Sequence, residues 1–152
     1  MNEHADFGRI ADDVYYFTGF EDDVGAGFIV TERGIVVIDT TLLPTSARSF
    51  LGIIEALCPG KQVSAIINTH IHPDHHFGNE TFIKKFPKAE IIAHEKFLQR
   101  LKEWAAQSGE DISKDFPKRV MRKDDARTTY YRPYLQTVNV IPPSKTISSD
   151  TL

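Results

Sequence analysis

One polar run, residues 69–79 (Thr-His-Ile-His-Pro-Asp-His-His-Phe-Gly-Asn), constrains the fold more than any other feature of the sequence. It holds four of the six histidines, with Asp74 among them. The β-branched apolar residues 63–67 lead into it and predict a short buried strand, and Gly78-Asn79 after it predicts a turn into a helix. The polar side chains therefore crowd a tight loop at the carboxyl end of a strand, where open α/β sheets usually place their sites.

The residue types in this loop are those of a metal site. Neutral imidazole nitrogens and a carboxylate are suited to zinc, and they also serve iron or manganese. A single histidine here would be interpreted as an exposed loop residue. Four histidines within seven residues, with an aspartate between them and a buried strand before them, favour metal binding instead.

The run resembles the HxHxDH signature of the metallo-β-lactamase superfamily, as His70-x-His72-x-Asp74-His75. The resemblance implies that His70 and His72 bind a first metal ion, and that Asp74 and His75 bind a second. Asp74 would also orient or deprotonate the attacking water. His76 lies outside the signature and receives no ligand role. Relatives with a redox di-iron centre tend to have Glu in place of His72, so the resemblance favours zinc, although single-iron dioxygenases share the motif.

Asp39 ends an apolar run, residues 35–38, and is followed by two threonines. As a local feature it is a turn residue that hydrogen-bonds its own backbone. An Ile-Asp-Thr at this place is typical of the same superfamily, and there it implies a carboxylate beneath the metal site. Such a carboxylate accepts the second N–H of a ligating imidazole and fixes its tautomer.

Hydrophobic periodicity predicts an α/β fold. A β-hairpin, a helix and a strand follow one another in the first 68 residues, so a parallel crossover is expected. The expected strands are residues 14–17, 28–31, 35–39, 63–68, 89–93 and 136–141, with the start of another at 146–152. The expected helices are residues 43–58, 80–86 and 95–107.

Two further features stay open. His94 ends a predicted strand and either caps the following helix or lines the same cleft as the metal loop. Residues 108–133 lose apolar periodicity, which indicates a solvated helix or loop or, alternatively, a cover over the cleft that attracts an anionic substrate. The basic side chains of this segment are Lys114, Lys118, Arg119, Arg122, Lys123, Arg127 and Arg132.

Length and charge limit the remaining classes. The chain of 152 residues is long enough for one domain, residues 1–152, and too short for two ordinary ones. The formal net charge of −3 argues against nucleic acid or a membrane as partner. No leader pattern and no apolar run of about 20 residues is visible, so a cytoplasmic protein is expected. The single cysteine, Cys58, follows a helical apolar face and is expected to be a packing residue.

The resemblance also implies ligands that this sequence lacks. In relatives, two more histidines and a bridging aspartate come from the second half of an αββα sandwich. No histidine follows His94, and Asp150 lacks the apolar strand that would present a bridging aspartate. The chain is therefore expected to supply the N-terminal βα half of such a sandwich. A fragment of a longer hydrolase, two chains that share ligands, and a half-fold without chemistry are the three explanations.

The implied activity is zinc-dependent hydrolysis of a small-molecule substrate through a metal-bound water, with up to two zinc ions in the complete domain. Ester, amide, thioester and phosphodiester bonds all stay open. One alternative is a non-catalytic half-domain that binds at most one metal ion, and another is a mononuclear iron dioxygenase. A half-sandwich would expose the inner face of its sheet, so self-association through that face is expected.

Overall fold

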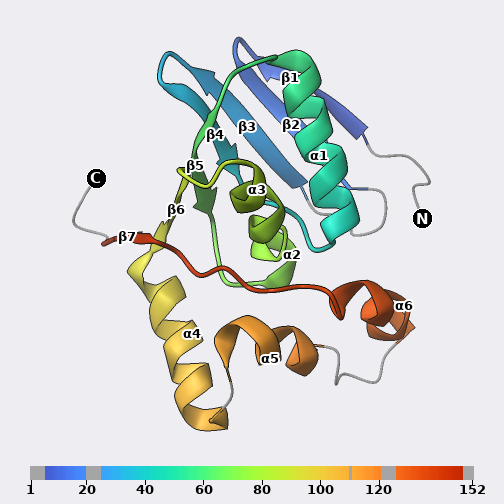
Figure 1. Cartoon of the computed structure of the whole chain (residues 1–152), viewed down its shortest axis with the longest axis vertical. Helices are drawn as coiled ribbons and strands as arrows, with labels where there is room; N and C mark the ends of the chain where they lie inside the picture. Colours follow the sequence, from blue (N-terminus) through green and yellow to red (C-terminus); the bar gives the residue numbers. More distant parts are fainter. Residues whose placement is uncertain (1–5, 20–24, 110, 121–125, 149–152) are drawn as a thin grey trace.

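The computed structural model describes residues 6–19, 25–109, 111–120 and 126–148. Within these residues a single mixed sheet has helices against one face and a second group of helices below its lower edge (Figure 1). The predicted α/β class is confirmed. Its strands are β1 (Asp6–Ala11), β2 (Val14–Thr18), β3 (Gly25–Thr31), β4 (Gly34–Ile38), β5 (Val63–Asn68), β6 (Glu90–His94) and β7 (Lys145–Ile147). Its helices are α1 (Pro44–Leu57), α2 (Pro73–His76), α3 (Asn79–Lys85), α4 (Glu95–Ser108), α5 (Ile112–Val120) and α6 (Ala126–Leu135).

The strands lie in the sheet in the order of the sequence. The first four form an antiparallel meander, and β4, β5, β6 and β7 are parallel to one another. The predicted hairpin and the predicted parallel pairing of β4 with β5 are both confirmed. Because β4, β5 and β6 run in the same direction, the loops that follow them meet at one edge of the sheet.

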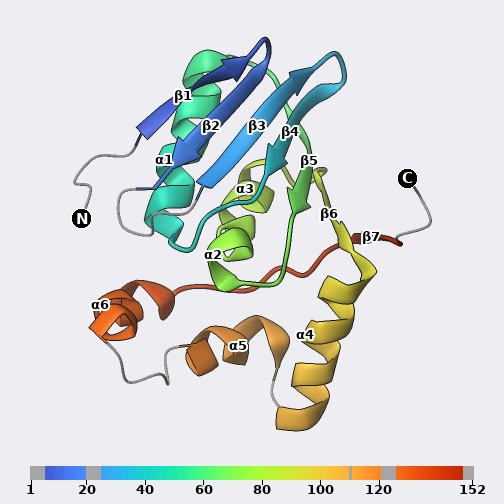
Figure 2. The same ribbon diagram turned by 180° about the vertical axis from the view of Figure 1, so that it is seen from behind.

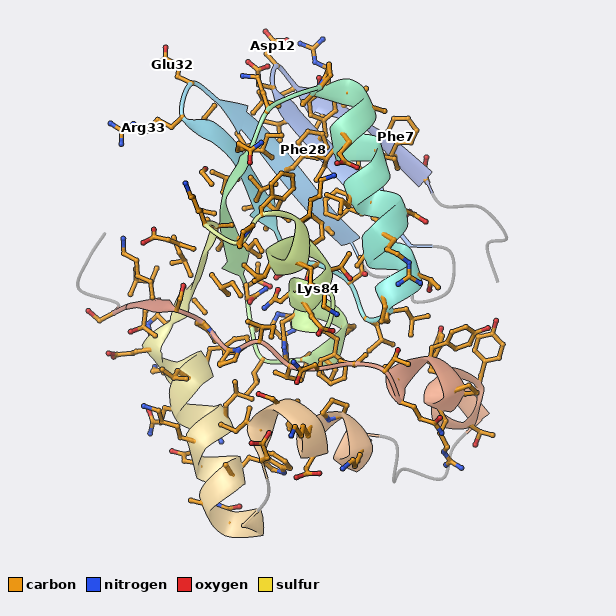
Figure 3. The ribbon with its side chains drawn as sticks, viewed as in Figure 1. Phe7, Asp12, Phe28, Glu32, Arg33 and Lys84 are labelled. Atoms are coloured by element: carbon orange, nitrogen blue, oxygen red, sulfur yellow. The ribbon has the colours of Figure 1, made fainter. Side chains whose placement is uncertain are left out.

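The core lies between the sheet and helices α1 and α3. One cross-strand row, Phe28, Val37, Ile66 and Ile91, faces these helices and is buried. Phe50 of α1 contacts this side of the sheet, with ring centroids 6.2 Å from Phe28. Figure 3 shows Phe28 in this layer, whereas Glu32 and Arg33 of the β3–β4 turn point away from it. Cys58 packs into the same core, as expected of a packing residue.

The opposite face of the sheet is apolar and open. Ile38, Ile67 and Ile92 are paired across three neighbouring strands and are only half buried. Ile29 is paired with Val36 on the same face and is 36% exposed. Figure 2 shows that none of the described helices lies over this face of β1 to β5. A half-sandwich is expected to expose the inner face of its sheet, and in the described part of the chain this face is uncovered.

The helices after β6 pack below the carboxyl edge of the sheet (Figure 1). Residues 108–133 contain α5 and most of α6, in which Lys114 and Lys118 are exposed. The apolar side of these helices is buried, because Phe116 and Tyr131 contribute to a cluster with Leu43 and Phe77. Arg122 and Lys123 of the predicted basic segment lie outside the described residues.

The predicted strand at 136–141 is wrong. Val138 and Val140 alternate like a strand and are buried, but they pack in the cluster of α5 and α6. The backbone N–H of Val140 donates to Ser113 O at 2.9 Å, so the segment pairs with a helix end and not with the sheet. The strand expected from residue 146 is present as β7, and residues 149–152 of that expectation lie outside the described ones.

Among the described residues, no helix has the length and apolar character that a membrane span requires.

The loops after β4 and β5 interlock at Gly78. The N–H of Thr40 donates to His75 O at 3.0 Å, and the N–H of Gly78 donates to Thr41 O at 3.1 Å. A Cβ atom on Gly78 would lie 1.9 Å from Thr40 O and 2.8 Å from Ala47 Cβ. Only a residue without a side chain allows the two loops to approach this closely.

The open face leads to a first prediction. The 152-residue chain should self-associate and bind an apolar dye, because a contiguous apolar patch of this kind is rare on soluble monomers. Ile67→Lys, in the middle of the face, should reduce both signals, and Gln99→Lys on the exposed surface of α4 should leave them unchanged. Sedimentation velocity and dye fluorescence measure the two effects. A monodisperse, dye-silent wild-type monomer would contradict the prediction.

A second prediction concerns the interlocked loops. Gly78→Ala should lower the free energy of unfolding by roughly 3 kcal/mol, since the new methyl group meets backbone on one side and α1 on the other. The matched control is Gly52→Ala in α1, where a Cβ atom has no neighbour within 4 Å. That change should stabilise the protein by roughly 0.5–1 kcal/mol through helix propensity. Urea unfolding followed by circular dichroism compares them, and equal stabilities would refute the close approach.

Candidate metal-binding site

Asp39 lies at the base of the site, immediately after β4. Its backbone is in the left-handed region, with φ of 57°, and its N–H donates to Ile67 O of β5 at 2.9 Å. The residue is 4% exposed. A buried carboxylate needs hydrogen-bond donors around it, so the surroundings of Asp39 show which groups the fold must bring to it.

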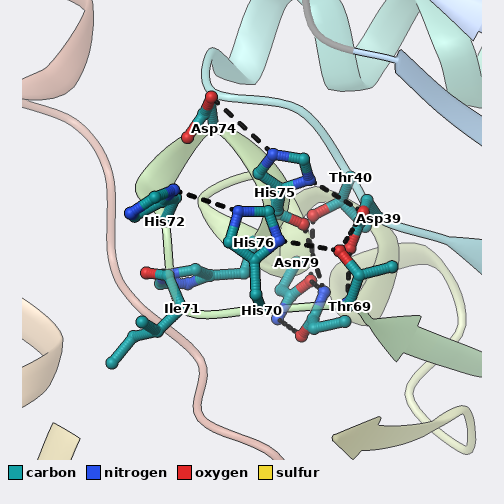
Figure 4. Close-up of polar contacts among 11 residues, drawn as sticks. Asp39, Thr40, Thr69, His70, Ile71, His72, Asp74, His75, His76 and Asn79 are labelled. Atoms are coloured by element: carbon teal, nitrogen blue, oxygen red, sulfur yellow. Dashed lines mark hydrogen bonds and ion pairs between the residues drawn. The ribbon is translucent and has the colours of Figure 1, made fainter. Parts of the chain in front are cut away.

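Three donors converge on this carboxylate (Figure 4). Oδ1 accepts from the backbone N–H of Thr69 at 2.8 Å, and Oδ2 accepts from the Thr69 hydroxyl at 2.7 Å. Oδ2 also lies 2.8 Å from Nδ1 of His75. A carboxylate can only accept, so Nδ1 of His75 carries a proton, and in the neutral ring Nε2 keeps its lone pair, directed away from Asp39.

The same reasoning extends through Thr69 to His70. The Thr69 hydroxyl has one hydrogen, which it donates to Asp39, so it accepts from Nδ1 of His70 at 3.0 Å. Nε2 of His70 therefore also keeps its lone pair. Desolvation, followed by repulsion from the His75 and His72 rings, lowers the pKa of His70 and keeps this ring neutral near pH 7.

The first pair of potential ligand atoms is Nε2 of His70 and Nδ1 of His72. They lie 3.0 Å apart and form a hydrogen bond, in which Nδ1–H of His72 donates to the lone pair of His70 Nε2; binding of both nitrogens to a metal ion would require the His72 proton to move to its Nε2. Both residues are exposed at the rim of the loop. Two nitrogens bound to one tetrahedral zinc ion at 2.0–2.1 Å lie about 3.3 Å apart. The observed spacing is close to this value, so the pair fits two positions of a zinc site.

The second pair is Asp74 and His75, on the short helix α2. Nε2 of His75 lies 3.8 Å from Oδ2 of Asp74. The His75 ring also lies close to the first pair, since its centroid is 3.9 Å from that of His70. The structure therefore brings all four residues of the predicted signature together above Asp39. Sequence analysis missed α2 itself, which begins with Pro73 at its first turn and ends at His76.

A buried amide pair supports the loop from behind, and the sequence analysis missed it. Asn79 Nδ2 donates to Asn68 Oδ1 at 2.9 Å, and Asn68 Nδ2 donates to Asn79 Oδ1 at 3.2 Å. The Thr40 hydroxyl donates to the same Asn79 oxygen at 2.9 Å, and Asn68 Nδ2 also contacts His75 O at 3.2 Å. The only sequence signal was a polar residue at the end of a buried strand.

His76 is placed differently from the other three histidines of the run. It is fully buried, and burial lowers its pKa to about 4. Its Nε2 lies 3.1 Å from Ile71 O, in the segment between His70 and His72. Its ring contacts are with Phe77, Phe97 and Phe116, and its exclusion from the signature stays a prediction.

His94 and the basic segment contribute little to the site as described. Nδ1 of His94 accepts from the backbone N–H of Lys96 at 3.2 Å, so the side chain caps α4. Lys118 forms an ion pair with Asp115 of its own helix at 2.6 Å. The first observation favours the local alternative for His94, and the second concerns Lys118 alone, so a role of the basic segment in the cleft stays a prediction.

The described residues supply ligand pairs and not complete sets. Within residues 6–19, 25–109, 111–120 and 126–148, no group of three or more histidine, cysteine, aspartate or glutamate side chains is arranged to hold a metal ion. Asp150, which received no bridging role from its sequence context, lies outside these ranges. Each metal position would thus need donors besides the two that the loop provides.

Comparison with known proteins identifies one family. The sequence profile of the metallo-beta-lactamase superfamily matches residues 21–142. No curated protein sequence matches the chain. Among solved structures, a metallo-beta-lactamase from Hirschia baltica aligns with a TM-score of 0.57 and 14% identity, over 94% of this chain and 52% of its own.

Two further structures align in the same way. MEM-A1, a subclass B3 metallo-beta-lactamase from a soil metagenome library, has a TM-score of 0.55 and 19% identity over 97% of this chain and 47% of its own. The inverting sec-alkylsulfatase Pisa1 from Pseudomonas sp. has a TM-score of 0.53 and 26% identity over 64% of this chain and 16% of its own. The chain thus spans about half the length of these lactamases, and the predicted half-sandwich fold is confirmed.

Proposed function

Because the chain belongs to the metallo-β-lactamase superfamily, we propose that it is the ligand-bearing half of a zinc-dependent metallo-hydrolase. His70 and His72 hold the first metal ion, and Asp74 and His75 hold the second. The superfamily generally binds metal ions, typically zinc, and its structural relatives here are hydrolases by name. The domain proposed is a single one, residues 1–152, with up to two zinc ions when its coordination is complete.

The observation that carries this proposal is the shared carboxylate of Asp39. Its hydrogen bonds to His75 and, through Thr69, to His70 leave the outward nitrogen of each ring unprotonated. Metal-binding histidines usually donate their second N–H to an acceptor such as a carboxylate, which fixes the tautomer and raises the basicity of the ring. A loop of merely solvated histidines has no requirement for this arrangement.

The chain's own residues then have distinct roles. A zinc ion in such a site acts as a Lewis acid and lowers the pKa of water to about 7. Asp74 stands at the rim, where its half-buried carboxylate can accept a proton from the attacking water. Asp39 stays below, closed off from substrate, and keeps the His75 ring and, through Thr69, the His70 ring oriented.

The proposed substrate is a small molecule with a hydrolysable bond. The relatives named above are lactamases and an alkylsulfatase, so hydrolysis is common to them while the bond differs. Ester, amide, thioester and phosphodiester bonds remain the candidate bonds for this chain.

A non-catalytic half-domain is the second candidate, and one observation favours it. The described residues provide two donors at each metal position, whereas catalytic zinc sites have three protein ligands. On this alternative the loop holds at most one ion, and association through the open sheet face is the function.

Metal content distinguishes the two candidates. The purified chain should bind zinc in preference to iron or manganese, and near two ions per chain would indicate that the remaining donors are supplied, for example by a second copy. His70→Ala should remove most of the bound metal. Elemental analysis together with the oligomeric mass measures both quantities.

The matched control is His94→Ala, which removes a histidine at the same sheet edge whose side chain caps α4. It should leave the metal content unchanged. If the wild-type chain binds no zinc, or if His94→Ala lowers the content as much as His70→Ala, the proposed ligand set is wrong. Bound iron in place of zinc would favour oxidative chemistry.

Asp74 leads to a separate prediction on turnover. In the zinc-loaded protein, Asp74→Ala should reduce hydrolysis of bis-p-nitrophenyl phosphate, p-nitrophenyl acetate or nitrocefin, whichever is cleaved, by roughly 100-fold or more, the contribution of a positioned general base. Glu103→Ala, an exposed carboxylate on α4, is the control and should change nothing. Unchanged turnover in a folded Asp74→Ala protein would remove Asp74 from the mechanism.

A further inference from the structure

His76 is a buried imidazole in an aromatic cage. It is 0% exposed, and three phenylalanine rings surround it, with centroids 5.1 Å away for Phe77, 5.0 Å for Phe97 and 6.2 Å for Phe116. These rings come from three separate segments, namely the end of α2, helix α4 and helix α5. The packing therefore holds the imidazole in one position.

One of the two ring nitrogens has a partner and the other has none. Nε2 lies 3.1 Å from Ile71 O. A carbonyl oxygen accepts, so Nε2 carries the proton of the neutral ring. Nδ1 is buried and has no hydrogen-bond partner among the described residues.

This imbalance shows what the imidazole contributes. A buried polar atom without a partner destabilises the fold, so a phenylalanine or leucine would fill the cage at lower cost. What an apolar side chain cannot do is donate to Ile71 O. The hydrogen bond to Ile71 O is thus what an imidazole provides at this position and a phenylalanine or leucine does not.

The direction of the Ile71 carbonyl affects the geometry of the first ligand pair, His70 and His72. It belongs to the peptide plane that joins Ile71 to His72, so fixing its direction restricts the backbone torsions on either side of that plane. Those torsions set where the His72 ring points relative to His70. In addition, His76 lies on α2 with Asp74 and His75, so the same bond ties the second pair to the first.

We propose that His76 is a positioning residue for the metal centre, whose Nε2–H holds the Ile71 carbonyl so that His70 and His72 keep the spacing of two ligands on one ion. The inference rests on the proposed function, because the spacing of His70 and His72 matters only if both bind one metal ion. It also assigns a role to α4 and α5: through Phe97 and Phe116 they hold the His76 ring, and so they support the metal loop without touching the metal.

Zinc affinity of the whole chain tests the inference. His76→Phe fills the cage but removes the donor, so the protein should fold while its zinc affinity, measured by chelator competition, falls roughly 10- to 100-fold, as for other residues that orient ligands. His76→Gln can place an amide N–H near the position of Nε2 and should recover part of the loss. Phe17→Leu is the control: it loosens the core cluster between the sheet and α1, to which no residue of the metal loop belongs, and should leave the affinity within about threefold of wild type, well below that loss.

The outcomes separate this inference from the proposed function. A folded His76→Phe protein with wild-type zinc affinity would overturn the positioning role alone, and a wild-type chain without zinc would overturn both. If His76→Phe does not fold, His76→Gln decides the question. A folded His76→Gln protein with zinc affinity as low as that of His70→Ala would overturn the role of the donor. Imidazole ¹⁵N spectra of the metal-free protein give an independent check: His76 should be the Nε2–H tautomer, and an Nδ1–H tautomer would refute the bond to Ile71.

Discussion

The site depends on one buried charge, the carboxylate of Asp39. A carboxylate that is 4% exposed is tolerated only if donors reach both oxygens, and the fold brings them from the loop after the neighbouring strand. Asp39 therefore has two tasks that cannot be separated. It fixes the start of the β5 loop through Thr69, and it orients the His75 ring through the hydrogen bond with Nδ1. The geometry of the ligand pairs follows from satisfying this one group.

Backbone conformation contributes to the same end. Asp39 and Thr41 both have positive φ, at 57° and 71°, which for a β-branched residue such as Thr41 is strained. Two hydrogen bonds stabilise this strained backbone: Thr40 N–H donates to His75 O, and Gly78 N–H donates to Thr41 O. The two loops thus stabilise each other, and neither conformation would persist without the other. The close approach at Gly78 is the steric condition for this arrangement.

The sequence predicted those elements whose periodicity is local and strong. The β3–β4 hairpin, the parallel β4–β5 unit and helix α4 all have long apolar patterns, and the structure contains them. Residues 136–141 show the limit: Val138 and Val140 alternate like a strand because they are buried against helices, and periodicity alone cannot identify the partner. Strand β1 was missed because it is an exposed edge strand with few β-branched residues, and Ile10 in it is 68% exposed.

For the site, the motif located the candidate ligands but not their support. The pairing of Asn68 with Asn79, and the enclosure of His76 by Phe97 and Phe116, join segments that a pattern search treats separately. Their signals in the sequence are an asparagine at a buried strand end and one histidine more than the signature needs. Only the packed structure brings these residues together, because the paired residues are 11 to 40 positions apart in the sequence.

The open sheet face and the incomplete ligand sets are connected by topology. Ile38 and Ile67, in the middle of the apolar face, lie in the strands that lead directly into Asp39 and the histidine loop. A surface that covers this face therefore reaches the same edge at which the described residues give each proposed metal position only two donors. If that surface supplies them, metal binding and association become linked: each ion bound strengthens the association, and association strengthens metal binding by the same factor. A site with two donors on one side of an interface binds a metal ion weakly by itself and more tightly when the partner surface adds donors. These properties are those of a metal centre that is completed by assembly.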